Sequence, residues 1–332
     1  MRRRLGKGYS SASIKNLICH TDFVVSLSIF DVSVVGHFSI DSIFLPNKRA
    51  PYVVLGGSAA YTSLILKRLG LTVSVVSKVG GDFPNAYLWW LKKEGINLDG
   101  VAKVENAETT RFELKYNADL SRRILQLKSK APPINMEDLP KPLRAKAVHI
   151  APIANETPPE VIDKLRSCAE ILSIDPQGLV RNFDSKGHFT YSSLKDKHLL
   201  ELVNIYKSSS KEIKAVTRLS DISSAIKAIH DYGVEIVIVT FGVKGTLLSA
   251  EETKYQIPAY KTEKIVDPTG AGDVFIGGFL AEHVKGKNAF WCACVGSAAA
   301  SVSVEAIGPT FQHDKTEIYR RANALYEKGI KG

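Results

Sequence analysis

Residues 267–280 have the sequence Asp-Pro-Thr-Gly-Ala-Gly-Asp-Val-Phe-Ile-Gly-Gly-Phe-Leu, and this stretch decides both the fold and the chemistry that we expect. Its first four residues are typical of a turn, and the small residues that follow let the backbone approach a ligand closely. From Gly272 onward the apolar residues follow helical spacing. The turn is therefore predicted to lead into a helix whose first N–H groups are free to bind an anion.

Asp273 lies in the first turn of this predicted helix, next to the expected anion site. A carboxylate repels a bound phosphoryl group, so anion binding alone does not explain its position. Its position is explained if the carboxylate orients a hydroxyl nucleophile and accepts its proton during phosphoryl transfer. The alternative is an ordinary aspartate at a helix start. We favour the catalytic interpretation because the turn, the small residues and the carboxylate occur together.

The rest of the chain alternates between strand-like and helix-like segments. This order predicts right-handed crossovers and an α/β fold, a doubly wound and mostly parallel sheet with helices on both faces. The last 60 or so residues are expected to be largely helical. We predict strands at about 30–36, 72–76, 148–150, 171–174, 202–206 and 234–239, and helices at about 58–69, 84–94, 159–169 and 221–230, the last capped by Ser220.

Two segments, at about 43–54 and 107–130, break this alternation with short period-two patterns. They predict antiparallel strands outside the parallel sheet, which together form a small discontinuous β lid. A small sheet with exposed edges is marginally stable, so we expect it to be covered by the body or by the same sheet of a second subunit. In a homodimer formed through the lid, Phe112, Leu114 and Ile124 would be buried. The alternative is a monomer.

The composition of the 332 residues sets limits on the class of protein. Hydrophobic residues make up 45% and charged residues 23%, which excludes general disorder. We see no apolar run of the roughly 18 residues that a membrane span needs. Four cysteines without Cys-x-x-Cys spacing are typical of reduced thiols, and hence of a cytoplasmic protein. The formal net charge of +10 suits an anionic ligand.

Residues 1–29 form a basic N-terminal extension that we exclude from the fold. It is either a targeting presequence or nucleic-acid-binding arm, or a disordered tail or an incorrectly assigned start. The chain would then be a single kinase domain at 30–332. A second function is also open, that of a catalytically weak or inactive regulator that binds nucleic acid through this tail, although the intact Asp273 makes nucleic acid the less favoured partner.

Two motifs resemble the signatures of the ribokinase-like (PfkB) family of carbohydrate kinases. Residues 267–273 resemble its C-terminal signature Asp-Thr-x-Gly-Ala-Gly-Asp, with Pro268 in place of the usual Thr. The Gly-Gly-Ser-Ala-Ala sequence at 56–60 resembles the N-terminal signature and stands at the right distance before it. The resemblance implies a ribokinase-like fold over about residues 30–330. It also implies that Asp273 is the catalytic base and that the backbone amides of Gly270, Ala271 and Gly272 form the anion hole.

The resemblance also implies an acceptor site at the N-terminal signature. Residues 36–41 resemble the family segment whose aspartate, here Asp41, binds substrate hydroxyls. A carboxylate there suits two contacts to a vicinal diol, although it could also be a solvated loop acid. The expected substrate-binding residues are the two side chains and two glycines of these motifs, a lid arginine and the catalytic aspartate: Ser39, Asp41, Gly56, Gly57, Arg111 and Asp273.

The donor side has a counterpart as well. Residues 240–245 resemble the family's Thr-x-Gly-x-x-Gly, which implies that Thr240, Gly242 and Gly245 bind ATP together with Gly270 and Gly272. The family's Asn-x-x-Glu, tied to Mg²⁺, has Ser209 in place of Asn, so Glu212 is expected to hold the metal through water. Asp175 stands where relatives have an aspartate facing the phosphates. K⁺ is a further candidate ion.

The sequence lacks the motifs of other enzyme classes. No Gly-x-Gly-x-x-Gly follows the first strand, as a nicotinamide oxidoreductase requires, and no P-loop or His-Glu-x-x-His occurs. The sequence therefore predicts an ATP- and Mg²⁺-dependent kinase for a hydroxyl group of a small polyol, sugar, cyclitol or nucleoside.

Overall fold

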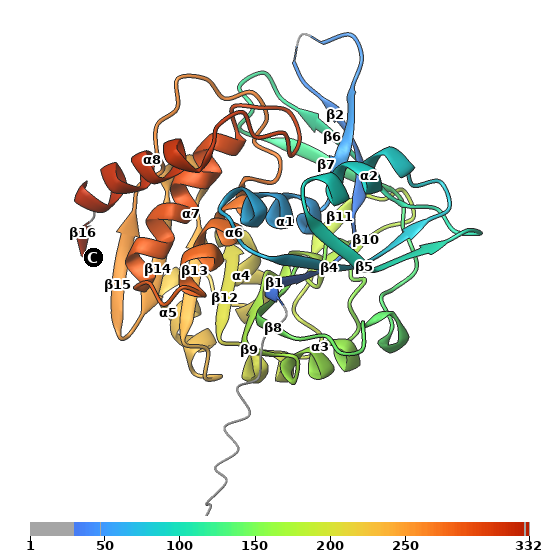
Figure 1. The fold of residues 1–332 in the computed structure, drawn as a ribbon. Coiled ribbons are helices and arrows are strands. Elements are labelled where there is room, and N and C mark those ends of the chain that lie inside the picture. Colours follow the sequence, from blue (N-terminus) through green and yellow to red (C-terminus); the bar gives the residue numbers. More distant parts are fainter. Residues whose placement is uncertain (1–29, 47, 329, 332) are drawn as a thin grey trace, which may run out of the picture.

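The main body of the computed structural model is a ten-stranded sheet (Figure 1). The structure describes residues 30–46, 48–328 and 330–331, so the expectation for residues 1–29 lies outside the described part of the chain. In spatial order the strands are β16 (Ile330–Lys331), β15 (Thr253–Ile257), β14 (Thr246–Ala250), β13 (Ile236–Thr240), β12 (Ile205–Ser209), β9 (Ala169–Ile174), β8 (Ala145–Ile150), β1 (Phe30–Val35), β4 (Val73–Gly80) and β5 (Ile96–Val104).

The strands from β13 to β5 run parallel, and β14, β15 and β16 extend the sheet with antiparallel pairs. Helices cover both faces. One face carries α1 (Ser58–Arg68), α2 (Asn85–Lys93), α6 (Ala271–His283), α7 (Ala289–Ser303) and α8 (Lys315–Lys328), and the other α3 (Pro159–Arg166), α4 (Ser210–Thr217) and α5 (Ile222–His230). The predicted doubly wound, mostly parallel fold is thus confirmed.

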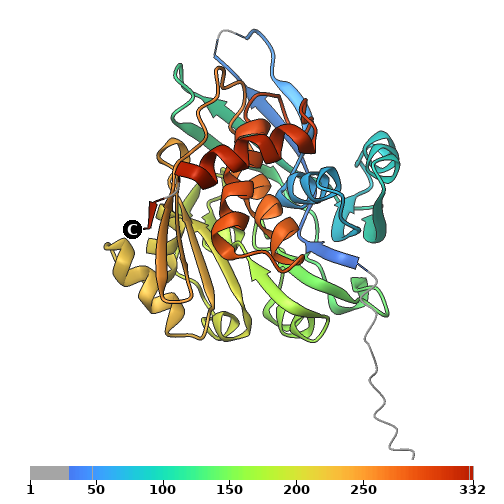
Figure 2. The ribbon, with the colours of Figure 1, turned by 60° about the vertical axis from the view of Figure 1, so that its left-hand side comes forward.

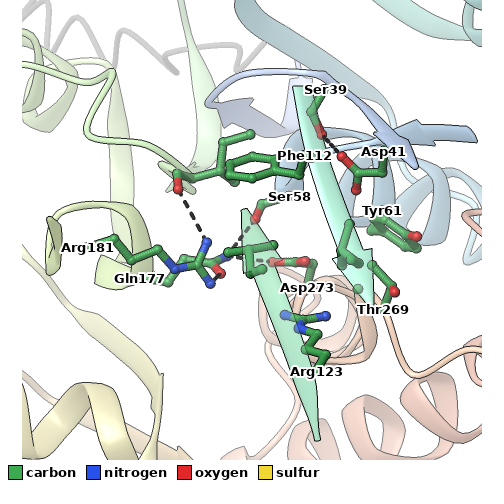
Figure 3. A pocket seen from close by; sticks show the side chains of 15 residues that line it. Ser39, Asp41, Ser58, Tyr61, Phe112, Arg123, Gln177, Arg181, Thr269 and Asp273 are labelled. Atoms are coloured by element: carbon green, nitrogen blue, oxygen red, sulfur yellow. Dashed lines mark hydrogen bonds between the residues drawn. The ribbon is translucent and has the colours of Figure 1, made fainter. Parts of the chain in front are cut away.

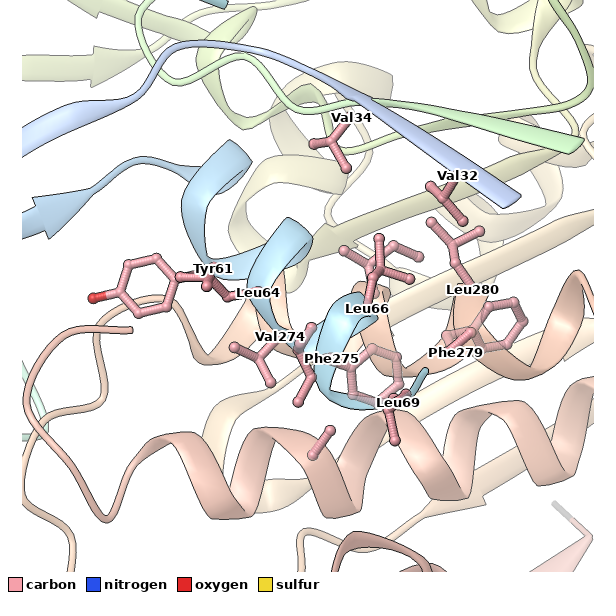
Figure 4. Packing of buried hydrophobic residues seen from close by; sticks show 14 of the residues in the cluster. Val32, Val34, Tyr61, Leu64, Leu66, Leu69, Val274, Phe275, Phe279 and Leu280 are labelled. Atoms are coloured by element: carbon pink, nitrogen blue, oxygen red, sulfur yellow. The ribbon is translucent and has the colours of Figure 1, made fainter. Parts of the chain in front are cut away.

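Helix α6, which begins at the key motif, is the central helix of its face. Its residues 274–282 are all buried, and α1 and α7 pack on it. Figure 4 shows Val274, Phe275 and Phe279 of α6 among apolar side chains of α1. Helices α6 and α7 pack so closely that a Cβ at Gly278 would lie 3.0 Å from the Cα of Gly296. Figure 2 shows the C-terminal helices, in orange and red, together against the sheet. The start of α6 is therefore anchored to the main core.

A second, four-stranded sheet stands apart from the body, with the order β3 (Tyr52–Gly56), β2 (Ser39–Phe44), β6 (Thr110–Tyr116) and β7 (Arg123–Ser129). It combines the two segments that we predicted to leave the parallel sheet. The β2–β3 and β6–β7 pairs are antiparallel, but the central β2–β6 pair is parallel. A third, two-stranded sheet, formed by β10 (Arg181–Phe183) and β11 (Phe189–Tyr191), had no counterpart in the predicted elements.

The β10–β11 hairpin joins the small sheet to the body. The Leu127 N–H of β7 donates to the carbonyl of Gly187 in the hairpin turn at 2.8 Å, and Gln126 forms a bridge with His188. The aromatic rings of Phe112 and Phe183 lie 6.2 Å apart across the same junction. The small sheet is therefore held at a second place besides its chain connections.

Two local predictions were wrong, and one alternative is excluded. Asp41 lies within strand β2 and is 4% exposed, so it is not a solvated loop acid. The strand expected at 202–206 starts only at Ile205, because His198–Leu202 form a 3₁₀ helix. Helix α5 is capped by the Asp221 carboxylate, which accepts from the Ser224 N–H at 2.7 Å, and not by Ser220. Within the described residues, no helix has the length and apolar character to cross a bilayer.

Candidate active site

The turn before α6 is held by the buried carboxylate of Asp267. It accepts hydrogen bonds from the N–H and hydroxyl of Thr269 at 2.9 and 2.6 Å, and from the Gly308 N–H at 3.1 Å. Gly270 follows with a φ of 74°, which a residue with a side chain rarely adopts. A Cβ there would also lie 2.3 Å from the ring of Tyr61. The turn thus requires both Asp267 and Gly270.

The turn leaves backbone amides without partners among the described residues at the start of α6, which form the candidate anion site. The N–H groups of Gly272 and Asp273 donate to no backbone group of the described chain, while Ala271 makes a long bond to the Pro268 carbonyl at 3.4 Å. The ammonium of Lys207, on β12, lies beneath this start, 2.8 Å from where a Cβ of Gly272 would be. Lys207 is buried and pairs with Asp175. Free amides and a fixed positive charge therefore meet at one point.

Asp273 projects from this helix start into a pocket (Figure 3). Its Oδ1 accepts a hydrogen bond from the Gln177 side chain at 3.2 Å, and its backbone carbonyl accepts one from Thr62 at 3.1 Å. Burial raises the pKa of Asp273 above its usual value, and the positive charge of Lys207 opposes this shift. A carboxylate in this setting is suited to accept a proton.

The pocket lies between the body and the small sheet and contains about 380 Å³ of empty space, partly open to solvent. The small sheet lines it with Ser39, Asp41, Phe112, Leu114, Arg123 and Leu125, and the body with Gly57, Ser58, Tyr61, Ile153, Gln177, Arg181, Thr269, Gly270 and Asp273. Of the predicted substrate-binding residues, the structure brings together Ser39, Asp41, Gly57 and Asp273.

Asp41 is the carboxylate that the small sheet contributes to this pocket. It is 4% exposed and accepts a hydrogen bond from Ser39 at 2.7 Å. Burial raises its pKa to about 7. Gly56 leaves room for it, because a Cβ there would lie 2.1 Å from a carboxylate oxygen of Asp41. Gly57, with φ 86°, is the residue before α1. Both glycines are thus needed by the local geometry.

Arg111 does not line the pocket. Its guanidinium forms an ion pair with Asp82 at 2.6 Å, and against the effect of burial this pair and two hydrogen bonds from Thr109 lower the pKa of Asp82 to about 2. The arginine of the small sheet that lines the pocket is Arg123, which donates to the hydroxyl of Tyr116 at 3.1 Å. Tyr116 in turn bonds Thr269 of the α6 turn at 2.9 Å. A row of side chains therefore links the small sheet to the anion site.

The predicted donor residues lie at the carboxyl ends of adjacent strands. Thr240 ends β13 and pairs with Ser209 at the end of β12. Gly242 and Gly245 shape the following turn, with φ of 62° and 92°. A Cβ at Gly245 would lie 2.3 Å from the Ile257 carbonyl, so the turn packs directly on β15. Ligands of doubly wound folds bind at this edge of the sheet.

Glu212, the predicted metal-linked residue, serves as part of a helix cap. Its Oε2 accepts from the Ser209 N–H at 2.7 Å, and the Ser209 hydroxyl accepts from the Glu212 N–H at 3.4 Å. The other carboxylate oxygen, Oε1, has no hydrogen-bond partner among the described residues. No cluster of three or more metal-ligating side chains occurs in the described chain. Glu212 thus offers one oxygen to a metal-bound water at most.

The sequence analysis did not single out Lys207, Gln177, Arg181 or Arg123. Lys207 had a signal, since a lysine within the apolar strand at 205–209 must find a partner. Gln177 lies two residues after Asp175, but Asp175 itself does not line the pocket. Arg181 and Arg123 lie on strands whose partners come from distant segments, so no local pattern marks them.

The comparisons with known proteins agree with this geometry. A family model described as "pfkB family carbohydrate kinase" matches residues 30–316. A cytidine kinase of Thermococcus kodakarensis is 30% identical, covering 80% of this chain and 93% of that protein. An inositol 3-kinase of Arabidopsis thaliana is 28% identical over 87% of this chain and 80% of its own. Among solved structures, the nucleoside kinase of Methanocaldococcus jannaschii has a TM-score of 0.69 at 28% identity, covering 89% and 98% of the two chains. A sulfate complex of a pyrophosphate-dependent kinase of the ribokinase family, at 24% identity, has a TM-score of 0.75 and covers 87% and 99%.

Fold, site and relatives together define a phosphotransferase that acts on a hydroxyl group. The chain belongs to the pfkB family of carbohydrate kinases, a family that generally uses ATP and Mg²⁺.

Proposed function

We propose that this protein transfers the γ-phosphoryl group of ATP to a hydroxyl of a small sugar, cyclitol or nucleoside. One observation carries the proposal. The Asp273 carboxylate faces the pocket beside the free amides of the α6 start, and Asp41 faces the same pocket from the small sheet. A hydroxyl between the two carboxylates would lie next to the anion site, which is the arrangement that phosphoryl transfer needs.

Each group then has a distinct role. Asp41 and Ser39 accept hydrogen bonds from acceptor hydroxyls and fix the orientation of the ring. Asp273 accepts the proton of the attacking hydroxyl. The N–H groups of Gly272 and Asp273, with the ammonium of Lys207, stabilise the negative charge of the transferring group. Gly270 and Ala271 shape the turn that aims these amides.

The donor is held on the other side of α6. Thr240, Gly242 and Gly245 form the turn against which the nucleotide would lie, and Gly270 and Gly272 leave space for its phosphates. Bound Mg²⁺ supplies positive charge to the phosphate oxygens. The free Oε1 of Glu212 fits a hydrogen bond from a metal-bound water, and Lys207 supplies a permanent charge at the same place. K⁺ is proposed as an activating ion, which the comparison with Na⁺ below tests.

The test is a matrix of acceptors and donors. Cytidine and other nucleosides, myo-inositol, ribose and fructose are each combined with ATP–Mg²⁺ or pyrophosphate–Mg²⁺, and phosphorylated product is measured by ³¹P NMR. Asp273→Asn is the matched inactive control, and parallel reactions compare K⁺ with Na⁺ and add EDTA. Product with ATP that depends on Asp273 supports the proposal. No product with any pair, together with salt-dependent binding of DNA, would favour the regulatory alternative instead.

We also propose that the protein is a homodimer that pairs small sheets. Phe112 and Leu114 are already buried within one chain, at 4% and 1% exposure, so they are unavailable to a second subunit. The outer face of the small sheet instead exposes Val53 by 58% and Ile124 by 62%. Sedimentation velocity on the wild type and on Ile124→Lys decides between dimer and monomer.

The described cysteines are free thiols, which supports a cytoplasmic location.

A further inference from the structure

We infer that Gln177 and Arg181 are positioning residues for Asp273, and that Arg181 fixes the orientation of the Gln177 side chain which holds the carboxylate. This inference rests on the proposed role of Asp273 as the base. Neither residue belongs to the two signature motifs. The two side chains form a chain of hydrogen bonds that starts at the hairpin β10–β11 and ends at Asp273 (Figure 3).

The side-chain amide of Gln177 takes part in three hydrogen bonds. Its Nε2 donates to Asp273 Oδ1 at 3.2 Å and to the Ser58 hydroxyl at 2.7 Å, and its Oε1 accepts from Arg181 Nη2 at 2.6 Å. A guanidinium has donors only, so the amide oxygen must face Arg181. The NH₂ group must then face Asp273. Without Arg181 the amide could turn over and place its oxygen against the carboxylate, which repels it.

The backbone of Gln177 is held in place as well. Its N–H donates to the Asp175 carboxylate at 3.2 Å, directly after strand β9. The φ of Pro176 is fixed by its ring, and Gly178 packs closely on the backbone of Pro152, where a Cβ would lie 2.4 Å from the carbonyl carbon. The short 3₁₀ turn Pro176–Gly178 therefore presents the Gln177 side chain from a rigid base.

Arg181 has no competing carboxylate. No Asp or Glu of the described residues lies within ion-pair distance of it; its Nη1 donates to the Ile153 carbonyl at 3.3 Å, and its guanidinium lies 5.4 Å from the centre of the Phe189 ring. Its Nε is buried without a hydrogen-bond partner in the described chain. Burial of an unpaired Nε costs stability, and the guanidinium donates to a neutral amide instead of a carboxylate. This placement is explained if Arg181 orients the Gln177 amide that binds the Asp273 carboxylate.

Arg181 also connects Asp273 to the acceptor side. It is the first residue of β10, and the hairpin that it begins is joined to β7 through Leu127 and Gly187. A displaced small sheet would disturb this hairpin and with it the orientation of the amide. The base is thus best aligned when the sheet that carries Asp41 is seated on the hairpin.

The contact has a chemical consequence. A hydrogen bond donated to an ionised carboxylate stabilises the charged form, and it therefore opposes the rise in the pKa of Asp273 that burial causes. It engages Oδ1 and leaves Oδ2 for the acceptor hydroxyl. Loss of the bond should leave Asp273 protonated to a higher pH.

The experiment uses the full chain and four variants. Gln177→Met removes the donor at similar size, Arg181→Lys keeps the charge but not the planar fork, and exposed Gln312→Met is the control. Asp273→Asn assigns the resonance of Asp273 in protein labelled with ¹³C at aspartate carboxyl carbons. We expect Gln177→Met to raise the pKa of Asp273 by about one unit, Arg181→Lys by less, and Gln312→Met not at all. If Gln177→Met does not fold, Gln177→Ala, which removes the donor and adds no charge, takes its place.

The same variants are then assayed against pH. For Gln177→Met the acidic limb of kcat/KM should move upward by the same amount, with the acceptor KM and the high-pH kcat within a few-fold of wild type. A carboxyl titration and an acidic limb that match wild type would overturn the inference. An inactive wild type would overturn the proposed function, yet the carboxyl titration would still decide whether Gln177 and Arg181 hold Asp273.

Discussion

The ammonium of Lys207 lies beneath Gly272, 2.8 Å from the position that a Cβ of residue 272 would occupy. The lysine comes from strand β12 and the glycine from the first turn of α6, and neither element alone suggests the contact. Any side chain at 272 would displace the ammonium from the anion site. This explains in physical terms why the motif has glycine at this position.

Lys207→Met should abolish the fixed charge at the anion site and leave Asp175 buried without a partner. We expect stability to fall by about 3–5 kcal/mol and kcat by at least about 10²-fold. The double variant Lys207→Met/Asp175→Asn removes both charges, so urea unfolding should return toward wild type while kcat stays low. A double variant with wild-type turnover would show that Lys207 serves only to neutralise Asp175.

Asp41→Asn should improve stability while it weakens acceptor binding. Because burial raises the pKa of Asp41 from 3.8 to about 7, the folded state holds this proton more tightly than the unfolded state. The contribution of Asp41 to stability is therefore highest below pH 4 and declines as the pH rises to about 7. We expect Asp41→Asn to raise the Tm at pH 8, with no gain at pH 4. The acceptor KM should rise at least about tenfold. Equal Tm differences at both pH values would contradict the buried, raised state of Asp41.

Asp273→Asn should lower kcat by at least about 10²-fold and leave acceptor affinity within a few-fold, because the amide cannot accept the hydroxyl proton. Turnover in a coupled assay and acceptor binding by calorimetry separate the two effects. Near wild-type turnover would remove Asp273 from the proposed mechanism.

Gly187→Ala should weaken the junction between the hairpin and β7. Its φ is 79°, and a Cβ would lie 1.9 Å from the Leu127 carbonyl oxygen. Gly233→Ala is a matched control, since Gly233 has a similar φ of 93° but nothing within 4 Å of a Cβ. We expect faster hydrogen exchange of the Leu127 N–H and a lower kcat for Gly187→Ala only. Equal effects of both substitutions would attribute the loss to backbone strain alone.

The role of residues 43–54 and 107–130 as a lid remains a prediction. A verified acceptor should slow hydrogen exchange across both segments, because a seated small sheet excludes water from the site. Exchange that an acceptor at saturation leaves unchanged would mean that the small sheet is a fixed wall of the pocket.

The sequence predicted the doubly wound body well, because each helix and strand there carries its own periodicity and its own start and stop residues. The start of α6 was equally predictable from the sequence, since the turn, the small residues and the helix are contiguous. The parallel pairing of β2 with β6 was not, because it joins segments separated by about 70 residues and depends on the tertiary fold. For the same reason the sequence analysis predicted Arg111, and not Arg123, as a substrate-binding residue. Both are strand arginines, and only the register of β6 and β7 decides which one faces the pocket.

The small sheet has a hydrophobic cluster of its own, formed with two residues of the body: Ile43, Phe112, Leu114, Leu125, Ile153 and Ala154. The start of α6, by contrast, belongs to the main core. We therefore expect substitutions in the proposed acceptor wall to affect the stability of this minor cluster and to leave the packing beneath the proposed phosphoryl site intact. The two clusters would allow the choice of acceptor to be redesigned in the laboratory separately from the proposed transfer chemistry.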